Sequence, residues 1–105
     1  MARFDVYRNV GARAGSTPYL LEVQCNLLDE LETAVVVPLR RVDRSAPVAL
    51  PTRLIPRFEI EGRDCMLETP KLAAVPRRLL KECVASLADD QAAVTAALDF
   101  LFHGY

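Results

Sequence analysis

The sequence predicts a small, mainly antiparallel β-barrel closed by one C-terminal helix. Short stretches of alternating or β-branched apolar residues, which are typical of strands, recur along the chain before its final segment. The connections between them are short and contain no helix, which argues against a parallel α/β fold. The final segment, 88–105, changes to a helical spacing of apolar residues. With 105 residues, the chain is expected to form a single domain, 1–105.

The first strand is predicted at 3–8, where polar and apolar residues alternate. Phe4 and Val6 face inward in this interpretation and Tyr7 faces outward, so the strand is expected to be half-buried. Residues 9–18 contain two glycines and a proline and predict a loop with little core to pack.

The second strand is predicted at 19–25, with its odd-numbered residues facing inward and Glu22 facing outward. Residues 26–32 mix leucines with acidic residues, which allows a helical turn. Residues 33–39 are apolar on both faces and rich in β-branched side chains, which predicts a central strand. This strand is expected to end at Pro38, because proline has no N–H to donate to a neighbouring strand.

A β-hairpin is predicted in the second half of the chain. Residues 54–61 alternate, with Phe58 and Ile60 facing inward. Gly62 lies in the expected turn, and 65–69 returns as the partner strand.

Other stretches carry weaker patterns. Residues 40–52 contain three arginines and two prolines, which predicts an exposed basic loop. Residues 70–76 are expected to be a connector, since a proline stands at each end. Residues 79–87 predict a helical turn or an apolar loop before the final helix.

The C-terminal helix is predicted to begin near Asp89 and Asp90, whose carboxylates favour the positive end of a helix dipole. Its expected inner stripe consists of Val94, Ala97, Leu98, Leu101 and Phe102. Because this stripe runs almost to Tyr105, the helix is expected to be docked over its whole length. It would then hold His103, Gly104 and Tyr105 in a fixed place.

Charge and composition argue against a nucleic-acid-binding, membrane-spanning or secreted protein. A formal net charge of −1 gives no reason to expect nucleic acid or an anionic membrane as a partner. No apolar run approaches the ~18 residues of a membrane span. Asp5 and Arg8 stand where a signal peptide would be apolar, so a cytoplasmic protein is expected. Cys25, Cys65 and Cys83 are widely spaced among apolar residues and are expected to be buried free thiols.

The sequence predicts no catalytic site, metal or cofactor. His103 is the only histidine and no Cys-x-x-Cys pair accompanies it, as a zinc site would require. The chain has neither a Gly-x-Gly-x-x-Gly motif nor a phosphate-binding Gly-Lys-Ser/Thr loop. Its carboxylates are scattered among basic residues, which does not support a paired acid/base site. We therefore expect a binding protein and not an enzyme.

Several stretches occur together in a characteristic order and spacing. They are FDVY at 4–7, YLLEVQ at 19–24, LLD at 27–29, VVPL at 36–39, LIPRFEI at 54–60, and an ending that runs from LAAVP at 72–76 to FHGY at 102–105. As a set they resemble the CcdB family of toxin–antitoxin toxins over nearly the whole chain. The resemblance implies an SH3-like antiparallel β-barrel with a C-terminal α-helix and a two-fold homodimer.

The resemblance also implies a mode of action. Members of the family bind the DNA gyrase A subunit and trap its cleaved-DNA complex, and a cognate CcdA-like antitoxin neutralises them. The best-known members contact gyrase through a C-terminal Trp-Gly-Ile, which corresponds to His103, Gly104 and Tyr105 here. Only the glycine is kept. A neutral imidazole stacks on an arginine more weakly than an indole does, and a protonated imidazole repels it.

Further roles follow from the same resemblance. Leu101 and Phe100 are expected at the dimer interface, and Arg40, Arg41 and Arg44 are expected to meet an acidic antitoxin segment. Each residue at the chain end also has a plain structural interpretation: His103 as a surface histidine, Gly104 as a helix terminator and Tyr105 as a packing residue. The alternative functions are a non-poisoning CcdB-like protein that binds antitoxin and regulates its operon, and a toxin with a target other than gyrase.

Overall fold

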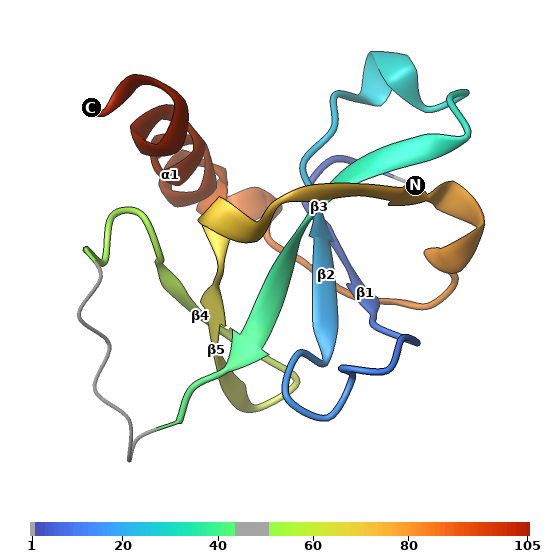
Figure 1. The fold of residues 1–105 in the computed structure, drawn as a ribbon, viewed down its shortest axis with the longest axis horizontal. Helices are drawn as coiled ribbons and strands as arrows, with labels where there is room; N and C mark the ends of the chain where they lie inside the picture. The colour runs from blue at the N-terminus through green and yellow to red at the C-terminus, as the bar shows by residue number, and fades with distance from the viewer. Residues whose placement is uncertain (1, 44–50) are drawn as a thin grey trace.

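The computed structural model describes residues 2–43 and 51–105. Within them, antiparallel strands form a curled half-barrel, and the helix α1 (Gln91–His103) lies at one side of it (Figure 1). The strands are β1 (Asp5–Arg8), β2 (Tyr19–Glu22), β3 (Thr33–Arg41), β4 (Arg57–Ile60), β5 (Arg63–Leu67), β6 (Ala73–Pro76) and β7 (Cys83–Ser86). Their order is β4-β5-β3-β2-β1-β7, and β6 also pairs with β3. The predicted fold class, mainly β with a C-terminal helix, is confirmed.

Two of these strands, β6 and β7, were not predicted. The expected connector at 70–76 contains β6, which pairs with the first half of β3. The expected apolar loop at 79–87 contains β7, which pairs with β1. Neither sequence, AAVP in β6 and CVAS in β7, alternates polar and apolar residues, so the pattern that indicates a strand is missing from both. Single 3₁₀ turns connect the strands: η1 (Asn26–Leu28), η2 (Thr69–Lys71), η3 (Arg77–Leu79) and η4 (Ala88–Asp90).

Strand β3 is central and changes its partner along one edge. One edge pairs with β2, while the other pairs with β6 at residues 33–36 and with β5 at residues 39–41. Pro38 lies between these two pairings, so the prediction that the strand ends there is wrong. Pro38 sits opposite Leu20, and its carbonyl oxygen accepts a hydrogen bond from the Glu68 N–H at 2.9 Å, on the edge away from β2. The Pro38 nitrogen therefore points to the edge that is shared by β5 and β6, so its lack of an N–H costs no hydrogen bond to β2.

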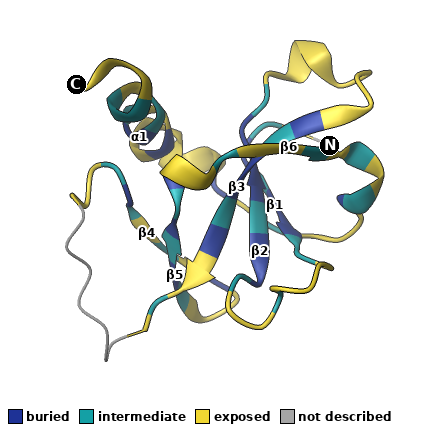
Figure 2. Ribbon diagram, in the orientation of Figure 1, coloured by how far each residue is buried: buried dark blue, intermediate teal, exposed yellow. Residues whose placement is uncertain are grey.

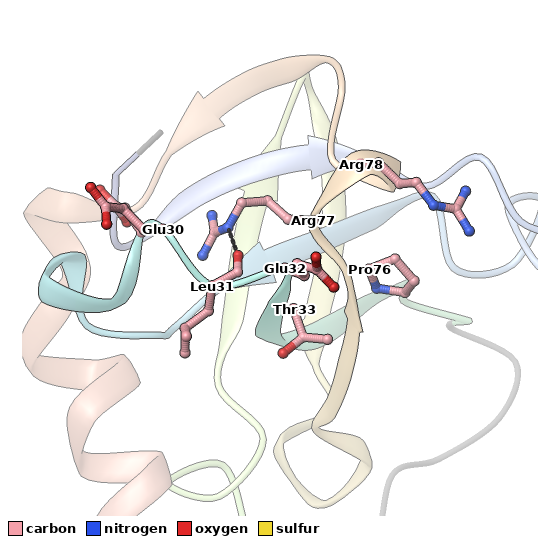
Figure 3. A pocket seen from close by; sticks show the side chains of 8 residues that line it. Glu30, Leu31, Glu32, Thr33, Pro76, Arg77 and Arg78 are labelled. Atoms are coloured by element: carbon pink, nitrogen blue, oxygen red, sulfur yellow. Dashed lines mark hydrogen bonds between the residues drawn. The ribbon is translucent and has the colours of Figure 1, made fainter.

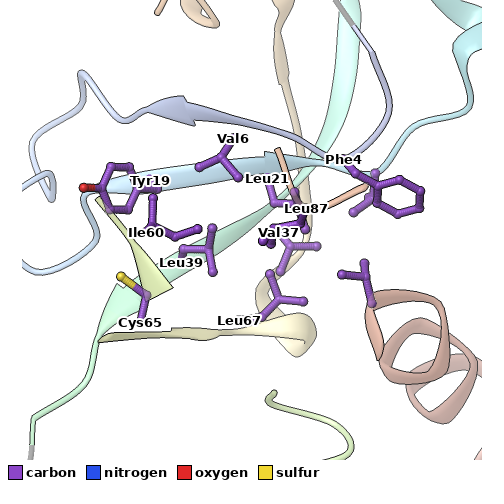
Figure 4. Packing of buried hydrophobic residues seen from close by; sticks show 12 residues of the cluster. Phe4, Val6, Tyr19, Leu21, Val37, Leu39, Ile60, Cys65, Leu67 and Leu87 are labelled. Atoms are coloured by element: carbon purple, nitrogen blue, oxygen red, sulfur yellow. The ribbon is translucent and has the colours of Figure 1, made fainter. Parts of the chain in front are cut away.

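The main core fills the inside of the curl (Figure 4). Tyr19 and Leu21 of β2 point into it, as the sequence predicts, and Val37 and Leu39 of β3 lie beside them. Phe4, Val6 and Ile60 were also predicted to face inward and are buried here, while Phe58 is half-buried against the cluster. Val94 brings helix α1 to the same core. The core therefore joins the sheet to the helix.

A second, smaller cluster covers the other face of β3. It consists of Tyr7, Ala34, Val36 and Leu80, with Leu20 and Val75 packed against it. The arm formed by β6 and η3 supplies Val75 and leads to Leu80. Tyr7 is only 2% exposed, so the predicted half-buried first strand is wrong: the arm covers its outer face. Burial, followed by the charge of Asp5, raises the pKa of Tyr7 to about 12.

Glu22 was predicted to face outward, but its side chain is 0% exposed. It pairs with Arg77, whose Nη1 lies 3.2 Å from a Glu22 carboxylate oxygen. Arg77 also donates from Nε to the Leu31 carbonyl at 3.1 Å and from its backbone N–H to the Glu32 carbonyl at 2.7 Å. One arginine thus ties together the end of β2, the segment before β3 and the β6–η3 arm.

The predicted hairpin between β4 and β5 is confirmed. Glu61 and Gly62 form its turn, both with positive φ (52° and 77°), as a two-residue hairpin turn requires. The Tyr19 hydroxyl donates to Glu61 at 2.6 Å, and an Arg8 Nη2 lies 3.2 Å from the same carboxylate. Arg8 also contacts Glu82 through Nε at 3.1 Å. The Tyr19 hydrogen bond, followed by the charge of Arg8, lowers the pKa of Glu61.

The cysteines are free but differ in exposure. Cys65 is buried as predicted, and burial raises the pKa of its thiol. The same prediction is wrong for Cys25 and Cys83, which are exposed. Cys25 follows the end of β2, and Cys83 begins the outermost strand β7.

The Glu61 contacts predict a pH-dependent contribution to stability. Because the pKa of Glu61 is lower in the folded chain, its contribution is complete above the ordinary carboxyl pKa and is lost as the pH falls through the lowered value. Glu61→Gln should therefore lower the free energy of unfolding at neutral pH, and the difference from the unaltered protein should shrink in acid. Urea unfolding between neutral and acid pH measures this difference, and a constant difference would contradict the assignment.

The buried ion pair predicts a second stability effect. Arg77→Met leaves the Glu22 carboxylate buried without its partner, which should cost about 3–5 kcal/mol of the free energy of unfolding. Glu22→Leu combined with Arg77→Met should recover most of this loss, because no charge then remains buried. Arg78→Met, at an exposed neighbouring position, is the matched control and should change stability by less than about 0.5 kcal/mol. Equal urea midpoints for the two single variants would refute the effect.

Candidate functional site

Helix α1 is anchored through its first half. Val94 and Ala97 are fully buried, Leu98 is half-buried, and the helix contacts η2. Phe102 is 66% exposed, so the predicted inner stripe is wrong at its last position. The C-terminal end of the helix extends away from the sheet (Figure 1), which leaves Phe102 without a surface to pack on. The first half of the helix is therefore packed on the core, and its last residues are exposed.

The helix ends at a glycine, as the sequence allows. Gly104 adopts a left-handed conformation (φ 79°, ψ 12°), and its N–H donates to the Phe100 carbonyl at 2.9 Å. This turn brings the rings of His103 and Tyr105 to a centroid separation of 5.9 Å, with a 32° angle between their planes. The left-handed turn thus sets the direction of Tyr105 relative to His103.

We call Phe102, His103, Gly104 and Tyr105 the aromatic tip. His103 is exposed, and Tyr105 is 74% exposed (Figure 2). Tyr105 is therefore not the packing residue of the plain structural interpretation. Three exposed rings at one helix end, those of Phe102, His103 and Tyr105, therefore have no role in the core. The structure brings together the residues that the resemblance singled out and adds Phe102, which the sequence assigned to the core.

The residues predicted at a dimer interface lie just before the tip. Phe100 and Leu101 are both half-buried within one chain. The guanidinium of Arg53 lies over the Phe100 ring, 5.5 Å from its centroid, a cation–π contact. Phe100 is thus partly covered by its own chain, and the interface role of both residues stays a prediction.

The basic residues predicted to bind the antitoxin are placed in part. Arg40 and Arg41 end strand β3 and are exposed, so the expected basic loop does not begin at residue 40. Arg40 lies opposite Met66, which lies opposite Arg57, so both arginines flank one methionine on the same sheet face. Arg44 lies outside the described residues. The end of β3 and the aromatic tip are far apart in Figure 1, so the structure does not combine them.

The sequence predicted no role for the segment between β2 and β3, residues 23–32. Its leucines are exposed: Leu27 is 92% exposed, and Leu28 and Leu31 are about half exposed. A hollow of about 640 Å³ adjoins Leu31 and is lined by this segment and by the end of the β6–η3 arm (Figure 3). The only signal in the sequence was the irregular mixture of leucines and acids at 26–32.

No group of three or more His, Cys, Asp or Glu side chains within 2–43 and 51–105 could hold a metal ion. No helix in these same ranges is both long enough and apolar enough to cross a membrane.

Comparison with known proteins then decides the family. The sequence profile of the CcdB protein family matches residues 3–104 of the 105. The chain belongs to the CcdB family. Membership suggests a toxin of a toxin–antitoxin system. Among curated proteins, none matches this chain.

The CcdB-family chain end yields a prediction about the shape of the tip. Gly104→Ala should cost about 1 kcal/mol, because an L side chain is strained at φ 79° whatever the space around it. Gly104→Asn should cost less, because asparagine tolerates the left-handed conformation. Thermal unfolding compares the two variants. Equal stability of the alanine variant and the unaltered protein would show that the left-handed turn is not required.

Proposed function

We propose that this protein is the toxin of a type II toxin–antitoxin system that binds the DNA gyrase A subunit. In this proposal it traps the gyrase–DNA cleavage complex, acts in the cytoplasm as a homodimer, and is neutralised by a cognate CcdA-like antitoxin. The observation that carries the proposal is the exposed aromatic tip at the end of a CcdB-family chain. No catalytic step is required of the toxin, because binding alone holds the complex.

The chemistry of the tip supports a cationic target group. Aromatic ring faces carry partial negative charge and attract an arginine or lysine placed over them. His103 and Tyr105 present two rings that lie near each other and at a moderate angle. Without the indole of the best-known members, each contact is weaker, and Phe102 extends the apolar surface around it. Gyrase-binding residues are therefore proposed to be His103, Gly104 and Tyr105, with Phe102 beside them.

A homodimer would double this weak contact. In the proposal, Leu101 and Phe100 meet their counterparts across a two-fold axis, so that the two tips lie close enough to hold one target together. Both side chains are half-buried in the single chain and can lose further exposed surface.

Antitoxin binding is proposed at the end of β3. Arg40 and Arg41 are exposed there and have no ion pair among the described residues. Arg57 adds a third guanidinium on the face of Arg40. Such a surface attracts an acidic segment, and the sequence adds Arg44 to the same proposal.

A gyrase assay tests the proposal. The purified protein should inhibit supercoiling by gyrase and accumulate cleaved DNA. Tyr105→Ala should raise the concentration needed by about tenfold, and His103→Trp should lower it, because an indole stacks better on a guanidinium. Val10→Ala, which trims an exposed apolar side chain outside the tip, is the control and should have no effect.

One observation favours a second candidate. Only Gly104 is kept among the three contact residues, which is also expected of a CcdB-like protein that has lost poisoning and only binds antitoxin and regulates its operon. If the unaltered protein neither inhibits gyrase nor arrests growth while His103→Trp does both, this second candidate replaces the first. If neither protein acts on gyrase but expression still arrests growth, the toxin has a different target.

A further inference from the structure

The hollow beside the start of β3 is a second concave surface, separate from the aromatic tip. In Figure 1 the segment before β3 and the β6–η3 turn lie on the opposite side of the molecule from the C-terminus. The hollow has a volume of about 640 Å³ and includes apolar surface from Leu31 and Pro76. Leu31 is about half exposed, and Leu28 next to it is exposed as well. A partner would therefore find both a recess and an apolar border there.

The walls of this hollow are built before any partner arrives. Arg77 binds the carbonyls of Leu31 and Glu32 and the carboxylate of Glu22, which fixes the segment before β3 against η3 (Figure 3). The Arg77 side chain is only 13% exposed, so solvent competes little for these contacts. Preformed recesses of this size are typical of binding sites, because binding then requires little ordering of the protein.

The acidic residues that line the hollow favour a basic partner. Asp29, Glu30 and Glu32 line the hollow, and all three are exposed. Arg77 is offset by Glu22, so among the charged residues that line the hollow three carboxylates stand against one further cation, Arg78, and the hollow is acidic. An acidic recess with apolar surface favours a basic side chain next to an apolar one and repels an acidic segment.

We propose that this hollow docks a segment of the antitoxin in which a lysine or arginine neighbours a large apolar side chain. The proposal rests on the proposed function, which makes the antitoxin a partner of this chain. Its basic residue meets Glu30 and Glu32, and its apolar side chain packs on Leu31 and Pro76. This chemistry is opposite to that of Arg40 and Arg41, which suit acidic residues. An antitoxin segment with separate basic and acidic parts would therefore bind in one direction only.

Charge reversal in the hollow tests this proposal. The probe is the C-terminal segment of the antitoxin encoded beside this protein, titrated by calorimetry into the full chain. Glu30→Lys with Glu32→Lys should weaken binding by about tenfold or more and should reduce its dependence on salt. Asp89→Lys with Asp90→Lys makes the same charge change at exposed sites outside the hollow and should leave affinity nearly unchanged. Thermal unfolding checks that both double variants fold.

A compensating change locates the contact. Replacing the basic residue of the antitoxin segment by glutamate should weaken binding to the unaltered protein and restore binding to Glu30→Lys with Glu32→Lys. Equal affinity of the two double variants, or a weakened hollow variant that no glutamate replacement rescues, would overturn the hollow while leaving the proposed function intact. No binding of the segment to the unaltered protein would instead overturn the antitoxin part of the proposed function, and the hollow proposal with it.

Discussion

The fold depends on the way strand β3 shares one of its edges between two partners. Its first half pairs with β6 and its last residues pair with β5, while β2 pairs with residues 36–39 on the opposite edge. Two strands can share an edge only if they diverge, so the sheet splits at Pro38 and curls on each side of it. The β5 side closes the main core, and the β6 side turns back over the other face of β3. Proline suits this point because it has no backbone N–H, and neither β5 nor β6 pairs with β3 at residue 38 to accept a hydrogen bond from one.

Because the β6–η3 arm covers the outer face of the sheet, Glu22 and Arg77 form a buried ion pair there. Once the β6–η3 arm covers β2, Glu22 has no solvent, and a carboxylate in that position requires a partner. Arg77 supplies it from the arm itself and also binds the segment before β3. A buried pair of this kind contributes little net stability compared with apolar residues. Its effect here is geometric, because it fixes where the arm and the segment meet and so shapes the acidic hollow.

Local patterns were sufficient for strands β1 to β5 and for the helix, and insufficient for β6, β7 and the burial of the outer face. Alternation located β1, β2 and β4, β-branched apolar residues located β3, and the turn at Gly62 located β5 as the partner of β4. Alternation also predicted that Tyr7 and Glu22 face outward, but both are buried. A two-residue alternation indicates which face of a strand packs on the core. It cannot show that a later segment, here the β6–η3 arm, covers the opposite face. Phe102 fits the helical stripe, but how far a helix stays in contact is decided by the sheet beneath it. The residues of the tip came from family resemblance, while the hollow needed two distant segments, 29–33 and 76–78, brought together by Arg77.

In the proposed function, the tip attracts a cationic target group even though it carries no indole. The last turn of α1 leaves carbonyl groups without partners inside the helix, and the Gly104 N–H satisfies only that of Phe100. These carbonyls form the negative end of the helix dipole, which attracts positive charge within about one turn. The faces of His103 and Tyr105 add a second attraction at the same end. Both contributions survive any exchange among aromatic residues, so a substitution at position 103 should change the strength of binding more than the sign of the charge that is bound.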